Sequence, residues 1–264
     1  MHVKYLLIGD SFTHGACVNR PNDIASKLRN LSKKKVLNLG YNGNGPLSNY
    51  ATLREYGAKD NNLKIDKIFW LHFEGNDLIE LNNELRVDFL KRYKNDLNFF
   101  QKLKVRQNEI NKVVYSIIAA EKEKYLKTSK IEKFIKLSQV RYIFFSLYFH
   151  LAGKNVKPNY FYYAQLSEFK EIIMLARDFS SKNQSKLYFV YLPDYNRFKI
   201  KNYKNNYDEV KLIVKDLNIP FIDVYNEIFM KEKNYLDLFS PIGGHYSIQG
   251  YEKVSKLIYE FTKY

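Results

Sequence analysis

The sequence predicts an α/β fold: a three-layer α/β/α sandwich around a mostly parallel sheet of about five strands, with a helical insertion between the halves of the sheet. Short apolar runs of strand length alternate with helical stretches, and the first three runs end in loops of glycine and small polar residues. A length of 264 residues suits a single domain, 1–264, that carries an insertion. The expected strands span residues 3–8, 35–39, 67–73, 186–192 and 219–224.

Helices are expected after the first two strands. One lies near 22–31, where Asn22 or Asp23 can accept hydrogen bonds from the first turn. The next begins at Pro46, because proline suits the first turn of a helix, and Gly57 ends it.

Two further helices are expected in the C-terminal part, near 206–217 and 248–263, with Ser247 as the N-cap of the second. The terminal helix has a continuous apolar stripe, which predicts that it packs on the sheet. The stripe consists of Tyr251, Val254, Leu257, Ile258 and Phe261.

The region between the halves of the sheet, about 79–182, shows neither a convincing strand nor a glycine-rich turn. Apolar residues recur there at helical spacing among lysines and arginines, which indicates amphipathic, basic helices. A long helix near 160–181 is expected to lead back into the sheet. The amphipathic pattern fits either a lid or a surface for homodimer formation.

The formal net charge is +15, from 43 Lys and Arg against 28 Asp and Glu. These lysines are scattered among Glu and Asn, and no nucleic-acid-binding motif accompanies them, so we interpret them as a solvated surface and expect no nucleic-acid partner. A single cysteine excludes an internal disulfide and a cysteine-based zinc site. No apolar run is long enough for an integral membrane segment, and the absence of a signal-peptide pattern predicts a cytoplasmic protein.

Three of the expected loops carry residues suited to acyl transfer. Ser11 follows a strand and could attack a carbonyl if a base removed its proton. Gly43 would let a backbone N–H approach an oxyanion closely, and Asn76 would supply a side-chain amide. The carboxyl ends of parallel strands share one rim, so these residues are expected together. Taken singly, each of these residues is better explained as a helix cap or a turn residue.

His245 is the candidate base, because it stands in a loop between Gly-Gly and the terminal helix. His72 falls within a strand and is interpreted as structural. The lone Cys17 is expected to be a small buried residue. Residues 194–197 (DYNR) follow a strand and are interpreted as a solvated loop.

Four sequence blocks in this order resemble the SGNH hydrolases, also called GDSL esterases/lipases. The blocks are GDSF after the first strand, NLGxxGxGP after the second, EGND after the third and GHYSxxGY before the last helix. The resemblance covers about 1–80 and 186–264. The longer strings NLGYNGNGPLSNYATLREYG and EGNDLIEL are similar to a subgroup often found among surface-polysaccharide genes.

This resemblance implies that Ser11 is the nucleophile and that His245 takes its proton. It implies an oxyanion hole made of the N–H groups of Ser11 and Gly43 and the side chain of Asn76. No metal or organic cofactor is implied.

The sequence departs from the family at one position. The family usually has Asp three residues before the histidine, where this sequence has Ile242. The group that orients His245 is therefore open between Asp237 and a main-chain carbonyl in 240–242. A serine–histidine dyad should still work, because the base needs orientation and tautomer control rather than a specific carboxylate.

We therefore expect a serine esterase that removes a short acyl group, acetyl above all, from a carbohydrate or small ester. An O-acyltransferase acting on a sugar and a thioesterase or lysophospholipase are alternatives that use the same residues. A different class is an inactive scaffold whose basic insertion binds an anionic polymer, and such binding would fall steeply with salt.

Overall fold

A computed structural model describes residues 2–58, 63–127, 165–241 and 244–263. Its five strands lie in the order β2-β1-β3-β4-β5, and every neighbouring pair is parallel. The five-stranded parallel sheet predicted from the sequence is thus confirmed. The strands are β1 (His2–Ile8), β2 (Val36–Asn38), β3 (Lys64–Phe73), β4 (Lys186–Leu192) and β5 (Phe221–Asp223).

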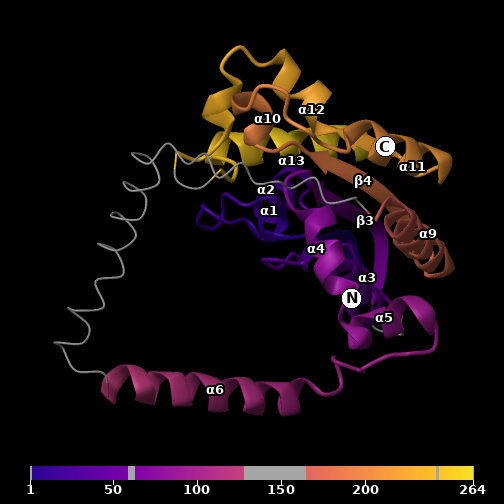
Figure 1. The fold of residues 1–264 in the computed structure, drawn as a ribbon, viewed down its shortest axis with the longest axis vertical. Helices are drawn as coiled ribbons and strands as arrows, with labels where there is room; N and C mark the ends of the chain where they lie inside the picture. The colour runs from indigo at the N-terminus through magenta and orange to yellow at the C-terminus, as the bar shows by residue number, and fades with distance from the viewer. Residues whose placement is uncertain (1, 59–62, 128–164, 242–243, 264) are drawn as a thin grey trace. The chain divides into compact units, whose positions relative to one another are not determined.

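Helices cover both faces of this sheet, which gives the three layers of the predicted sandwich (Figure 1). One face packs against α3 (Pro46–Gly57), α4 (Asp77–Glu84), α5 (Asp88–Asn95), α9 (Leu166–Lys182) and α11 (Tyr207–Asp216). The other packs against α2 (Ile24–Ser32), α12 (Val224–Glu227) and α13 (Ile248–Thr262). The predicted caps of α2 and α13, Asp23 and Ser247, accept the expected backbone hydrogen bonds.

The strand order has a switch point between β1 and β3. From β1 the chain crosses to β2 on one side and then returns to β3 on the other. In open α/β sheets this is where ligands bind, outside the carboxyl ends of the strands. The remaining short elements lie in the connections: α1 (Ser11–His14), α10 (Asn196–Lys199) and two 3₁₀ turns, Phe229–Lys231 and Tyr235–Leu238.

The chain divides into two compact units, residues 1–101 with 161–264, and residues 102–160. In the second unit the structure describes α6 (Gln107–Lys127). The second unit is shorter than the insertion expected over about 79–182, because α4, α5 and α9 belong to the unit of the sheet. The start expected for α9, residues 160–164, lies outside the described residues.

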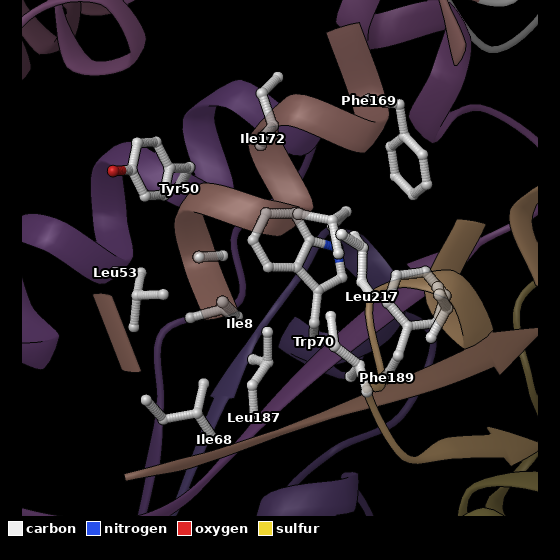
Figure 2. Packing of buried hydrophobic residues seen from close by; sticks show 14 of the residues in the cluster. Ile8, Tyr50, Leu53, Ile68, Trp70, Phe169, Ile172, Leu187, Phe189 and Leu217 are labelled. Atoms are coloured by element: carbon white, nitrogen blue, oxygen red, sulfur yellow. The ribbon is translucent and has the colours of Figure 1, made fainter. Parts of the chain in front are cut away.

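Trp70 on β3 lies at the centre of one apolar layer. Figure 2 shows its ring among side chains of the sheet and of α3 and α9, including Tyr50, Phe169 and Ile172. Its side chain is fully buried. Since burial of large apolar side chains dominates folding stability, this layer fixes α3 and α9 on the sheet.

A buried cation, Arg54, ties α3 to the segment that leaves the sheet. Its guanidinium donates to the carbonyl oxygens of Tyr93, Leu97 and Phe99 at 2.5, 2.6 and 2.9 Å. The adjacent Glu55 accepts from the hydroxyl of Tyr93 at 2.6 Å. A buried charge is tolerated only when it is well hydrogen-bonded. These hydrogen bonds give Arg54 and Glu55, the first two residues of REYG in the sequence block, a structural role.

No helix among the residues that the structure describes has both the length and the apolar character that a membrane crossing requires.

Candidate active site

Ser11 lies at the first turn after β1 with its polar groups available. Asp10 is the N-cap of α1 and accepts from the N–H of Phe12 at 2.9 Å. The capping role that the sequence allowed for Ser11 therefore falls to Asp10. Within the described ranges, the N–H of Ser11 donates to no acceptor. A helix N-terminus with an uncommitted N–H favours negative charge.

The structure brings His245 to Ser11, as predicted. Nε2 of the imidazole lies 2.9 Å from the hydroxyl oxygen of Ser11. The ring of Phe12 lies against the imidazole with their centroids 4.6 Å apart. The 2.9 Å between Nε2 and the hydroxyl oxygen is a hydrogen-bond distance, at which the histidine can accept the proton of the serine.

The GHYSxxGY block positions His245 through its other members. Tyr246 is fully buried, and its hydroxyl donates to the carbonyl of Pro193 at 3.0 Å. Ser247 caps α13 by accepting from the N–H of Gly250 at 3.2 Å. A Cβ on Gly250 would lie 2.2 Å from the carbonyl oxygen of Leu238, so only glycine fits there. The block anchors the residues that follow His245.

Gly43 has the conformation and exposure expected of an oxyanion donor. Its φ of +78° is left-handed, which glycine adopts readily. Its N–H has no acceptor in the part of the chain that the structure describes. Gly40, three residues earlier, has a packing role instead, because a Cβ there would lie 2.5 Å from the side chain of Thr13.

Asn76 stands at the N-cap position of α4, but its side chain makes no capping hydrogen bond. Its Oδ1 is buried and has no partner among the described residues, and its Nδ2 donates to none of them either. Its amide is therefore available for a ligand. Three donors from three loops at one rim are thus uncommitted: the N–H groups of Ser11 and Gly43 and the amide of Asn76.

Glu84 fixes the loop that carries Gly43. From α4, its buried carboxylate accepts from the N–H groups of Gly45, Leu47 and Ser48 at 2.8, 2.8 and 3.2 Å. These N–H groups form the N-terminus of α3, where a negative charge is stabilising. The loop is thereby held against α4, the helix that begins after Asn76.

Buried acids lie beneath Ser11. Burial, together with the neighbouring Asp77, raises the pKa of Asp10 to about 7. Burial also raises the pKa of Asp77 well above its ordinary value, and it lowers that of His72 to about 4. Oδ2 of Asp10 lies 3.3 Å from the hydroxyl oxygen of Ser11. At a pH below this pKa, the protonated Asp10 competes little with His245 for the proton of Ser11.

The structure does not bring Asp237 to His245. Asp237 is exposed, and its hydrogen bonds are those of its main chain, to Asn234 and Ser247. The alternative carbonyls at 240–242 lie partly outside the described residues. Instead, Nδ1 of His245 lies 3.6 Å from the sulfur of Cys17. Cys17 is exposed, which corrects the prediction that it is buried: it stands in a left-handed turn after α1, with a φ of +66°, and not in a packed element.

The DYNR loop is bound and not solvated, which corrects the interpretation from sequence. Arg197 forms a bidentate ion pair with Glu74 of the EGND block, with Nε 3.0 Å from Oε2 and Nη2 on Oε1. The same carboxylate accepts from the N–H of Asp194 at 3.0 Å. The ion pair between Glu74 and Arg197 was not predicted from the sequence. The opposite charges in EGND and DYNR, each just after a strand, were the signal that could have indicated it.

No three His, Cys, Asp or Glu side chains gather as they would around a metal ion within the described ranges.

No protein-family model and no curated protein matches the sequence. Solved structures do match. A lipase/acylhydrolase from Enterococcus faecalis is 13% identical with a TM-score of 0.51, over 99% of this chain and 96% of that one. The structure of TesA is 7% identical with a TM-score of 0.51, over 98% of both chains.

A member of the lipolytic protein G-D-S-L family from Veillonella parvula is 11% identical with a TM-score of 0.50, over 99% of this chain and 98% of that one. At such identities the likeness concerns the fold. The chain has the α/β/α fold of GDSL/SGNH hydrolases.

Proposed function

We propose that this protein is a serine ester hydrolase that removes a short acyl group, acetyl above all, from a carbohydrate or small ester. The observation that carries the proposal is the 2.9 Å contact between the hydroxyl oxygen of Ser11 and Nε2 of His245, at the carboxyl end of β1. The names of the structural neighbours, a lipase/acylhydrolase and a lipolytic protein, agree with an ester substrate.

In the proposed reaction, Ser11 attacks the ester carbonyl while His245 accepts its proton. The negative charge moves to the carbonyl oxygen, where Ser11 N–H, Gly43 N–H and the amide of Asn76 stabilise it. His245 then protonates the departing alcohol as the ester bond breaks. Water, deprotonated by His245, attacks the acyl-serine and releases the acid and free Ser11.

The short acyl group and the carbohydrate are supported by the sequence. The strings NLGYNGNGPLSNYATLREYG and EGNDLIEL are similar to a subgroup often found among surface-polysaccharide genes. An acetylated sugar is therefore the first carbohydrate substrate to test.

The test is hydrolysis of p-nitrophenyl acetate, butyrate and octanoate by the wild type, Ser11→Ala and His245→Ala. We expect the acetate to be preferred and each variant to lose about 10³-fold or more in kcat. Ser116→Ala and His2→Ala are matched controls, because both residues are exposed and His2 lies at the opposite end of β1 from Ser11. Acetate release from an O-acetylated sugar then tests the carbohydrate.

Hydrolysis that survives in Ser11→Ala would remove the proposed nucleophile. A preference for octanoate would contradict the short acyl group while leaving the reaction class intact.

A further inference from the structure

Cys17 occupies the place at His245 where a serine hydrolase triad has its third member. The imidazole has two nitrogens on opposite sides of the ring. Nε2 faces the hydroxyl of Ser11 at 2.9 Å, and Nδ1 faces the sulfur of Cys17 at 3.6 Å. Cysteine sulfur is a weak acceptor, and 3.6 Å is within the reach of an N–H to sulfur contact.

The turn that carries Cys17 is fixed from both sides. The N–H of Ala16 donates to the carbonyl of Ser11 at 3.0 Å, and the hydroxyl of Tyr251 on α13 donates to the carbonyl of Ala16 at 3.1 Å. The turn is thus bonded to the nucleophile and to the helix that follows His245. The sulfur and the imidazole are held by the same two elements.

Cys17 also has a backbone conformation that its side chain disfavours. Its φ is +66°, in the left-handed region that non-glycine residues rarely adopt. Gly15, two residues before it, is left-handed too, with a φ of +95°. With this backbone the sulfur of Cys17 lies 3.6 Å from Nδ1 of His245.

We propose that Cys17 is a positioning residue that holds His245 in the Nδ1–H tautomer, with its sulfur accepting from Nδ1. The proton on Nδ1 leaves Nε2 unprotonated and able to accept the proton of Ser11. The thiol thereby takes over the orienting role of the aspartate that is replaced by Ile242 in this sequence. The inference deepens the proposed esterase function and rests on it.

Because Cys17 has a left-handed φ, variants can be chosen that remove or replace its sulfur without straining the backbone. Cys17→Gly removes the sulfur at a position where glycine is unstrained, so the fold should be kept. Cys17→Asn supplies an amide oxygen that can accept from Nδ1, and asparagine tolerates this conformation. Val18→Ala, in the same turn, is the matched control.

The first readout is ester hydrolysis. We expect Cys17→Gly to lower kcat on p-nitrophenyl acetate by about tenfold or more with little change in KM, since Cys17 acts through His245 and not on the substrate. Cys17→Asn should recover most of this loss, and Val18→Ala should keep the wild-type kcat. An unchanged kcat in Cys17→Gly overturns the proposal.

The second readout does not depend on activity. With the five histidines labelled with ¹⁵N, the signals of His245 are those lost in His245→Ala. In the neutral imidazole, at a pH above the pKa of His245, we expect Nδ1–H in the wild type, a shift toward Nε2–H in Cys17→Gly and a return to Nδ1–H in Cys17→Asn. An unchanged tautomer in Cys17→Gly overturns the proposal even if kcat falls. If the wild type hydrolyses no ester, the proposed function fails, and the tautomer still decides the role of Cys17.

Discussion

The side chain of Asn76 has no structural role among the described residues, since it stands at a helix cap without capping. If its amide stabilises the oxyanion, Asn76→Ala should lower kcat by about 10²–10³-fold and leave KM nearly unchanged, because the contact forms only in the transition state. Steady-state kinetics on the preferred ester checks this. Asn83→Ala, exposed on the same helix, should behave as wild type. Equal losses in the two variants would contradict the role.

Asp10 makes a prediction about stability and pH. Its pKa is raised from 3.8 to about 7, so the folded state binds the proton more tightly than the unfolded state. The free energy of unfolding therefore falls as pH rises from about 4 to about 7, by up to roughly 4 kcal/mol at 1.36 kcal/mol per pKa unit. Asp10→Asn keeps an oxygen for the Phe12 N–H and should remove this loss.

Denaturant unfolding at pH 4 and pH 8 tests the prediction. The stability gained by Asp10→Asn over the wild type should be larger at pH 8. The same gain at both pH values would show that the carboxyl is not held in its protonated form by burial.

Among the elements, the N-terminus of α3 depends on Glu84 from α4. In Glu84→Gln, one carboxylate oxygen becomes an amide that opposes a backbone N–H, and the charge at the helix N-terminus is lost. We expect the free energy of unfolding to fall by about 2–3 kcal/mol. We also expect a lower kcat, because the loop of Gly43 is released.

Glu80→Gln on the same helix is the control, since among the described residues the carboxylate of Glu80 accepts a hydrogen bond from Asn83 alone, across 3.4 Å. Thermal unfolding and ester-hydrolysis kinetics of both variants test this prediction: Glu84→Gln should lose stability and kcat, and Glu80→Gln should behave as the wild type. Full activity in a destabilised Glu84→Gln would separate the helix cap from the site.

The elements that carry the site could be predicted because local chemistry specifies them. Pro46 at the start of α3, Asp23 before α2 and Ser247 before α13 are signals read within one turn. Once three parallel strands are expected, Ser11 and Asn76 must share a rim. Local signals could not show that His245 pairs with Ser11, because the two residues are 234 apart in the sequence. That prediction came from the family resemblance.

Contacts between distant segments could not be predicted in this way. Nothing near Arg54 in the sequence shows that carbonyls of the 93–99 segment will enclose a charge on α3. The pairing of Glu74 with Arg197 joins residues 123 apart. The exposure of Cys17 depends on a left-handed backbone that residue type does not indicate.

On the scale of the whole molecule, the single tryptophan reports on the unit that contains the sheet. Trp70 is fully buried in its apolar layer (Figure 2). We expect blue-shifted fluorescence that acrylamide quenches weakly, and a red shift in one cooperative transition as denaturant is added. Quenching of the native protein as efficient as that of the denatured protein would contradict the packing of α3 and α9 on the sheet.

The separation of 234 residues between Ser11 and His245 has a consequence for synthesis. A chain leaving the ribosome presents Ser11 long before His245, because the two residues lie 234 apart in the sequence. The loop that must close between them is almost the entire sequence, so their pairing is among the last events of folding. A nascent or prematurely terminated chain therefore cannot cleave an ester by this mechanism. Catalysis begins only when the C-terminal helix has docked, so activity serves as a readout of a completed fold.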